Sequence, residues 1–314
     1  MDLQEAQEIA FVGLALFQNC VRTILFCAFY GIYCLLFITG LYISSWKRIT
    51  GWSKNTMLCL LVATFLIVTL YSSANLAINM VFLQDEVISP APEGATVGQA
   101  VQEAVSQPLL EVGAQISNWT SSLIILIGDI IIIWRAWAVW MHNVIVKYFL
   151  AFSLLIIIGV NLADTSVDSE QSLIVAGRSL SFDWVFTALS LSMNVALTSL
   201  IAYQTWRYSR SMNVTSALGL RNTHVGRILF LLVESGAIFA IFQVLNLIFK
   251  GLDMKALNLS PLQFASLNVS VVFAYVAALN PLAIFILVET NNTYDQGSSA
   301  EQNTSHELTT FLES

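Results

Sequence analysis

The chain has 314 residues, of which 57% are hydrophobic and only 11% are charged, whereas soluble proteins carry roughly 25% charged residues. This composition excludes an ordinary soluble domain and predicts an integral membrane protein. The formal net charge of −7 says little about partners, because the acidic residues fall mostly between and after the apolar segments.

Seven apolar stretches are long enough to cross a bilayer as helices, which takes about 20 residues for a hydrocarbon core of about 30 Å. We therefore predict an all-α fold, a seven-helix membrane bundle. A short outer segment at residues 1–17 precedes it, and a polar tail at residues 289–314, predicted to be disordered and cytoplasmic, follows it. The predicted spans are residues 18–43, 56–82, 119–140, 148–162, 182–206, 228–249 and 264–288.

Lysine and arginine set the predicted orientation, because the cytoplasmic flanks of membrane spans are enriched in both. Nine of the 13 lysine and arginine residues lie on one predicted side of the bilayer, and the opposite loop at residues 83–118 contains none. The N-terminus is therefore predicted outside and the C-terminus in the cytoplasm. The expected location is the plasma membrane or another membrane of the secretory pathway.

The outer loop at residues 83–118 has two readings. Valines and alanines recur with helical spacing between residues 97 and 105, which favours a short amphipathic lid, but a solvated connector fits the same residues. Two N-x-S/T sequons, at Asn118 and Asn258, fall in predicted outer loops and are candidates for N-glycosylation.

The third span contains the stretch GDIIIIWRAWAVW, in which an apolar run carries Asp129 and Arg135. An ionisable group inside a span costs about 2.5 to 3.5 kcal/mol to insert, so each residue is a candidate functional group that needs a partner. Along a helix the two lie about 240° apart around the axis and about 9 Å apart in height, so their partners must differ.

Depth in the bilayer predicts those partners. Glu234 of the sixth span lies at nearly the depth of Arg135, which predicts a contact between them. Asn194 of the fifth span lies near the depth of Asp129, and Asn75 or Asn79 of the second span is an alternative partner. These polar groups fit static packing between helices, a conformational switch, or a relay for protons or ions.

The seventh span contains ALNPLAIF, residues 278–285. Pro281 has no backbone N–H and clashes with the preceding turn, which predicts a kink. Asn280 is expected to bond the freed carbonyls or a neighbouring helix. The kink fits either a hinge or a purely architectural role.

Three phrases in this order, GDIIIIWRAW, VESGAIF and ALNPL, resemble a group of uncharacterised seven-span proteins of mushroom-forming fungi. That resemblance implies an integral membrane protein of fungal source and brings no established activity. The chain is also distantly similar to G-protein-coupled receptors in its N-outside topology, the arginine of span three, the acid of span six and the Asn-Pro of span seven. It differs from rhodopsin-like receptors in having WRAW in place of their acidic-Arg-aromatic triplet.

Three functions remain open. The first is receptor-like sensing or signalling, with an unknown small ligand, an Arg135–Glu234 contact and, as the resemblance implies, a heterotrimeric G protein at the cytoplasmic face. The second is transport of a small solute or an ion at Asp129, and the third is a membrane scaffold without a ligand.

Several other functions are not expected. A retinal protein of the microbial type is excluded, because no lysine lies between Phe264 and Val288 to form the Schiff base. The sequence shows no nucleophile motif, metal-ligand cluster or phosphate-binding loop. No enzymatic activity, cofactor, metal site or nucleic-acid partner is therefore predicted, and the lipid bilayer is the one partner that composition itself implies.

Overall fold

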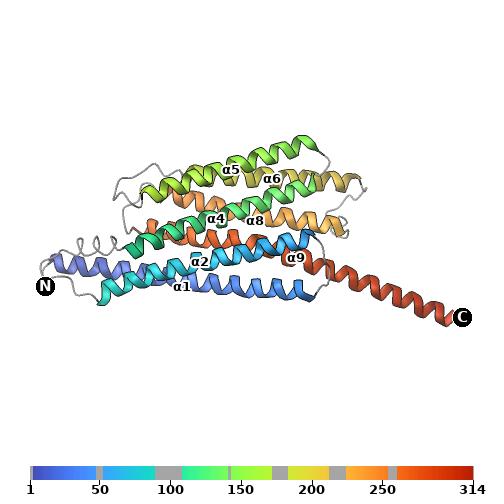
Figure 1. The fold of residues 1–314 in the computed structure, drawn as a ribbon, viewed down its shortest axis with the longest axis horizontal. Helices are drawn as coiled ribbons and strands as arrows, with labels where there is room; N and C mark the ends of the chain where they lie inside the picture. Colours follow the sequence, from blue (N-terminus) through green and yellow to red (C-terminus); the bar gives the residue numbers. More distant parts are fainter. Residues whose placement is uncertain are drawn as a thin grey trace.

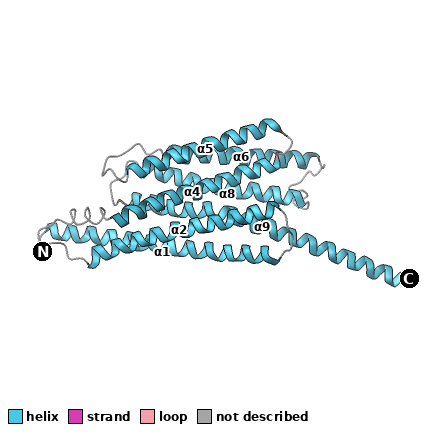
Figure 2. Cartoon of the chain, in the orientation of Figure 1, coloured by secondary structure: helices cyan, strands magenta, loops and turns pink. Residues whose placement is uncertain are grey.

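Seven helices make up the described part of the chain, which contains no strand (Figures 1 and 2). The computed structural model describes residues 3–46, 52–88, 108–140, 143–171, 183–211, 224–253 and 260–313. The helices are α1 (Leu3–Trp46), α2 (Trp52–Ile88), α4 (Pro108–Val139), α5 (Val144–Gln171), α6 (Asp183–Ser211), α8 (His224–Asp253) and α9 (Pro261–Glu313).

All seven helices are long and apolar enough to cross a bilayer, which confirms the predicted number of spans. The shortest apolar stretch, Val144–Ser166 of α5, has 23 residues and extends over roughly 35 Å at 1.5 Å per residue. It is longer than the predicted fourth span at residues 148–162, so even the weakest prediction is long enough to cross the hydrocarbon core.

Large apolar side chains cover the outside of the bundle. Leu35 is 68% exposed, Phe152 63% and Leu155 68%, and many similar residues lie on the outer faces of the other helices. In water such a surface would be an extended hydrophobic patch, whereas acyl chains would cover it in a bilayer. The chain is therefore a multi-pass membrane protein.

Helices α4 and α9 form the centre of the bundle (Figure 1). In each of them 56% of the apolar span is buried inside the protein, compared with 22 to 33% for the other five. Helix α4 packs against α2, α5, α6 and α9, and α9 packs against α1, α2, α4 and α8. Polar residues on α4 therefore face other helices rather than lipid.

An aromatic cluster joins α1, α2 and α9 on the side of the bundle away from α5 and α6. The ring of Tyr275 lies 6.2 Å from that of Phe26 and 6.1 Å from that of Tyr71, both edge-on. The Tyr275 hydroxyl lies 2.7 Å from the Ser72 hydroxyl and also donates to the carbonyl of Phe26. The buried polar end of Tyr275 is thus satisfied, as the interior of a membrane bundle requires.

The ends of the helices differ from the predicted boundaries. Helix α1 begins at Leu3 and not near residue 18, and the outer loop is shortened because α2 continues to Ile88 and α4 begins at Pro108. The stretch at residues 97–105 lies outside the described residues. Helix α9 continues to Glu313, where disorder was expected, and projects beyond the bundle (Figure 1). Once a span has nucleated a helix, each further residue adds a hydrogen bond without a new nucleation cost.

Candidate functional site

Asp129 lies within α4, ten residues before its last residue, Val139, and is only 3% exposed. The Ser190 hydroxyl of α6 lies 2.9 Å from each of its two carboxyl oxygens. Among the described residues no cationic side chain pairs with the carboxyl. Because an unpaired charge is costly to bury, the site is compatible with two charge-neutral states, a protonated carboxyl or a carboxylate with a bound cation.

A chain of hydrogen bonds continues from Ser190 into α8. The Gln243 side-chain nitrogen donates to Ser190 Oγ over 2.9 Å, and the Asn194 side-chain nitrogen donates to Gln243 Oε1 over 2.9 Å. Asn194 also donates to the backbone carbonyl of Gly236 over 3.3 Å. We call Asp129, Ser190, Asn194 and Gln243 the Asp129 network. It links α4, α6 and α8 through side chains that are at most 3% exposed.

The spacing of polar residues along α6 explains how the network forms. Ser190, Asn194 and Thr198 recur every four residues, so they lie on one face of the helix, and Thr198 donates to Asn194 Oδ1 over 3.3 Å. Gly236 lets α8 approach this face closely, because a Cβ atom at Gly236 would lie 2.5 Å from Thr198 Oγ1. The glycine therefore sets the distance across which Asn194 and Gln243 bond.

The predicted partners of Asp129 are only partly correct. Asn194 belongs to the same network but reaches Asp129 through Gln243 and Ser190 rather than directly. Asn75 donates instead to Ser117 Oγ over 2.7 Å, and the side-chain nitrogen of Asn79 is buried without a hydrogen-bond partner. Neither asparagine of α2 bonds Asp129.

The predicted contact between Arg135 and Glu234 is not formed. Arg135 is buried, at 6% exposed, and its Nη1 donates to the hydroxyl of Ser235 over 3.2 Å, whereas the Glu234 side chain is exposed on the surface of α8. The predicted depth of Arg135 in the bilayer was correct to within one residue of α8, because its partner Ser235 directly follows Glu234. Consecutive helical residues point about 100° apart, however, and it is Ser235 that faces α4.

Arg135 is incompletely satisfied where it lies. Its Nε donates to the carbonyl of Ile131 at 3.4 Å, while Nη2 is buried and has no hydrogen-bond partner. Ser235 itself donates to the carbonyl of Leu232 over 3.1 Å, so its hydroxyl accepts from Arg135 and donates within α8. Arg135 is therefore a second buried polar group, in addition to Asp129, whose contacts would change if the packing of α4 and α8 changed.

Double-mutant cycles on Arg135 distinguish the two candidate partners. Arg135→Ala and Glu234→Ala are expected to change the free energy of unfolding additively, within about 0.5 kcal/mol, because they share no contact. Arg135→Ala and Ser235→Ala are expected to couple by about 1 kcal/mol, within the range measured for hydrogen bonds between membrane helices. Reversible unfolding in mixed micelles measures both cycles, and coupling to Glu234 but not to Ser235 would contradict the structure.

Asn280 and Pro281 lie on α9. Pro281 is inside the helix, which continues past it. The side-chain nitrogen of Asn280 is buried without a partner, so the expected bond to a freed carbonyl is not formed. The carbonyl of Ala277, four residues before Pro281, lies 3.7 Å from the position that a Cβ atom on Gly128 would take. Gly128 thus brings α4 close to the turn of α9 that lacks a backbone donor.

The two candidate glycosylation sites are Asn118 and Asn258. Asn118 is half-buried within α4, inside the apolar span Leu110–Val139. Thr120 of the same sequon is buried, and its hydroxyl donates to the carbonyl of Ile116 over 2.6 Å. This placement does not favour modification of Asn118. Asn258 lies outside the described residues.

Several buried polar residues were not predicted from the sequence, among them Ser190, Gln243 and Asp164. Ser190 and Gln243 complete the Asp129 network, and the four-residue spacing of Ser190 with Asn194 was a signal for the first. Asp164 of α5 is 4% exposed and was assigned to a loop because the predicted span ended at residue 162. Within the described residues, no group of three histidine, cysteine, aspartate or glutamate side chains is arranged to hold a metal ion.

The site can hold or release one positive charge in the centre of the bundle, and the three helices that surround it are joined by side-chain bonds.

Comparison with protein-family models, with curated proteins and with solved structures finds no match to this chain.

Proposed function

We propose that the protein is a membrane sensor of receptor-like architecture, in which the charge state of Asp129 controls how α4, α6 and α8 pack. The observation that supports this function is a carboxyl group buried at the junction of three helices, with Ser190 as its side-chain partner and no paired cation among the described residues. Polar groups of this kind inside a membrane bundle are functional-site candidates by default.

The proposed switch follows from electrostatics. A neutral Asp129 fits the closed, dry network, whereas a charged carboxylate without a cation must recruit water or a counter-ion. Either demands space between α4 and α6, and Ser190 and Gln243 pass the resulting shift to α8. Arg135 and Ser235 join α4 to α8 about six residues, or roughly 9 Å, further along α4, so movement at Asp129 changes that contact too.

Asp129→Asn is the test of this switch. Nitroxide labels at two exposed positions, Arg210 of α6 and Phe230 of α8, report their separation by double electron–electron resonance, after replacement of the four cysteines, which form no disulfide. In the parent protein the distance distribution is expected to change between acidic and alkaline buffer or on addition of sodium. Asp129→Asn, which keeps the shape but cannot ionise, is expected to hold one distribution throughout.

Asp164→Asn is the matched control, because it neutralises another buried carboxyl on α5 and is expected to leave the response in place. An unchanged response in Asp129→Asn, or a response lost equally in both variants, would contradict the proposal. A parent protein that shows one distribution under every condition would favour static packing or a scaffold.

The proposal includes an N-outside topology, a G-protein partner and membership of the fungal seven-span group. The distribution of lysine and arginine supports an N-outside topology, and a glycan on Asn213, Asn291 or Asn303 in cells would overturn it. A heterotrimeric G protein at the cytoplasmic face would show as nucleotide exchange on a co-expressed α subunit. The resemblance to the seven-span proteins of mushroom-forming fungi supports a fungal source.

The buried carboxyl also favours a second function, transport of a proton or a small cation through the bundle. Reconstituted vesicles with a pH-sensitive or sodium-sensitive dye inside distinguish the two. Flux that depends on the protein and disappears in Asp129→Asn would establish transport, whereas a conformational response without flux supports the sensor.

A further inference from the structure

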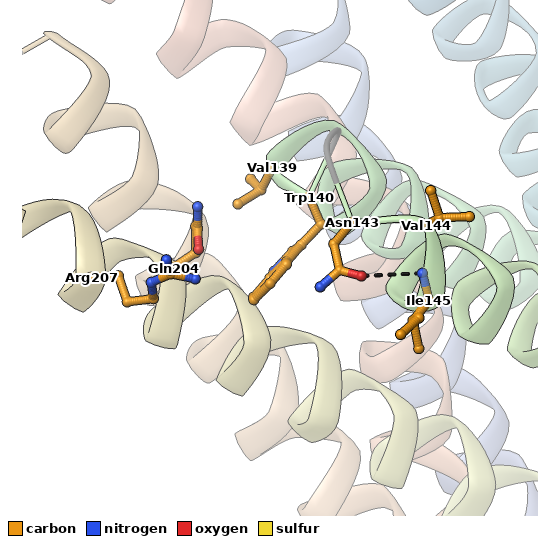
Figure 3. A pocket seen from close by; sticks show the side chains of 7 residues that line it. All are labelled: Val139, Trp140, Asn143, Val144, Ile145, Gln204 and Arg207. Carbon is orange, nitrogen blue, oxygen red and sulfur yellow. Dashed lines mark hydrogen bonds between the residues drawn. The ribbon is translucent and has the colours of Figure 1, made fainter.

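A groove opens at the end of the bundle where α4 stops and α5 begins, which we call the Trp140 end. Its volume is about 490 Å³. Figure 3 shows the Trp140 ring between Arg207 and Gln204 of α6 on one side and Asn143 and Ile145 on the other. The Trp140 indole N–H donates to the carbonyl of Leu200 over 3.3 Å. Leu200 lies roughly 15 Å along α6 from Ser190, so this groove is separate from the Asp129 network.

The polar side of the groove favours an anion. Arg207 is exposed and contributes a guanidinium group. The Asn143 side-chain oxygen accepts from the backbone N–H groups of Ile145 and Val146, over 3.1 and 3.4 Å, and so caps the start of α5. This turns the amide nitrogen of Asn143 toward Trp140 (Figure 3). Residues 134–148 and 198–211 contain no aspartate or glutamate, so no acidic side chain of these segments opposes an anion.

One acceptor in the lining of the groove has no hydrogen-bond donor. The side-chain oxygen of Gln204 is buried and accepts no hydrogen bond, and leaving a buried acceptor unpaired is destabilising. An occupant can bond this oxygen only when the Gln204 side chain turns toward the groove, and it must then bring an O–H or N–H group in addition to its negative charge.

Apolar side chains form the rim of the groove. Val144 is 61% exposed and Ile145 81%, and both follow directly after Asn143. A water-soluble phosphate would leave this rim uncovered, whereas a phospholipid would place its acyl chains along it. The surroundings match the headgroup layer of a bilayer, because Lys147 lies 5.7 Å from the centre of the Trp137 ring and Arg210 lies 5.4 Å from that of Trp206. Tryptophan and long basic side chains are typical of that layer.

We propose that this groove binds the headgroup of an anionic glycerophospholipid that also carries a hydroxyl or ammonium donor. The phosphate accepts from Arg207 and from the Asn143 amide, the donor group bonds Gln204 Oε1, and the acyl chains follow Val144 and Ile145. The predicted orientation places the Trp140 end in the cytoplasmic leaflet, where anionic lipids are enriched. This proposal does not depend on the switch at Asp129.

Native mass spectrometry of the full chain in detergent tests the proposal with three lipids. Phosphatidylserine has both the charge and the donor, phosphatidylmethanol has the charge alone, and phosphatidylcholine has no net charge. The parent protein is expected to bind them in that order of decreasing affinity. Arg207→Gln is expected to weaken phosphatidylserine binding on the order of tenfold, as loss of a charged hydrogen bond implies.

Arg210→Gln is the matched control, since Arg210 is also exposed on the same helix but does not line the groove. It is expected to weaken binding by less than about twofold, in line with an unspecific surface charge in screened solution. Equal losses in the two variants would overturn a site at the groove and leave general attraction of anions. Both side chains are exposed, so the thermal unfolding of each variant is expected to match that of the parent.

Gln204→Leu tests the donor, and it is expected to abolish the preference for phosphatidylserine over phosphatidylmethanol while leaving phosphatidylmethanol binding unchanged. A preserved preference would overturn the role of Gln204. Competition with glycerophosphoserine, which has the headgroup but no acyl chains, separates lipid from a soluble phosphate ester. Displacement of the lipid at equal concentration would overturn the lipid assignment in favour of the soluble ester.

Discussion

Gly236→Ala is expected to lower the free energy of unfolding by about 1 to 3 kcal/mol, the usual cost of overpacking a tight interior contact. The added methyl group would lie 2.5 Å from Thr198 Oγ1 and 3.1 Å from Thr198 Cγ2. Thr198 is β-branched, and in a helix its side chain has few alternative rotamers. The clash therefore separates α6 from α8 and lengthens the bond from Asn194 to the Gly236 carbonyl.

A second change on the facing helix is expected to restore stability. In Gly236→Ala with Thr198→Ala, the two atoms that clash most are removed and the remaining Cβ contact is 3.3 Å, which requires a shift of only a few tenths of an ångström. Thr198→Ala alone is expected to cost about 1 kcal/mol, the usual net contribution of an intramolecular hydrogen bond, because the Thr198 hydroxyl donates to Asn194 Oδ1 within α6. Unfolding in mixed micelles, followed by circular dichroism, measures all three variants.

Gly159→Ala provides the control, because a Cβ atom at Gly159 of α5 would meet nothing within 4 Å. It is expected to cause no loss of stability, since alanine favours helix over glycine. Equal destabilisation by the two glycine replacements, or failure of Thr198→Ala to rescue Gly236→Ala, would show that α6 and α8 are not held this closely.

Gln243→Leu is expected to lower the free energy of unfolding by about 2 kcal/mol, because the buried side chains of Ser190 and Asn194 each lose one of their hydrogen-bond partners. Leucine neither donates to Ser190 nor accepts from Asn194, and at 0% exposed the position admits no replacement from solvent. The Ser190 hydroxyl also loses the bond that orients it toward Asp129. The same variant is therefore expected to alter the response of the labelled α6 and α8 helices.

The coupling between Gln243 and Asn194 makes this result specific. Gln243→Leu combined with Asn194→Leu is expected to cost about 1 kcal/mol less than the sum of the single changes, because each removes the group that the other leaves unpaired. Val244→Leu, one residue along and 41% exposed, is expected to stay within about 0.5 kcal/mol of the parent. Additive effects of the first pair would show that the two amides are not bonded.

The Asp129 network and the groove at the Trp140 end are two separate polar sites at different heights in the bundle. The network joins the central helix α4 to α6 and α8 through buried side chains. The groove lies at one end, with a guanidinium, an amide nitrogen and an unpaired acceptor around an opening between α4, α5 and α6. A lipid bound there would contact the ends of the helices that the proposed switch moves, which makes lipid composition a variable to control in every measurement of that switch.

The seven spans could be predicted from sequence because hydropathy and length are local properties. A helix of about 20 apolar residues is the simplest way for a single stretch of chain to satisfy its backbone in a bilayer, and no knowledge of its neighbours is needed. Depth was also predictable, since each residue adds a constant rise of about 1.5 Å. That is why Arg135 was matched to the correct turn of α8 and Asn194 to the correct network.

Only the tertiary structure decided which face of each helix meets which neighbour. The rotation of a helix about its axis depends on packing with the others, and one residue changes the direction by about 100°. For this reason Arg135 donates to Ser235 and not to Glu234. Likewise, Ser190 bonds Asp129 directly, and Gln243 and Asn194 follow it in the chain of hydrogen bonds. The sequence alone determined that charged groups lie inside the membrane and at what height, whereas the packing of α4, α6 and α8 determined what they bond.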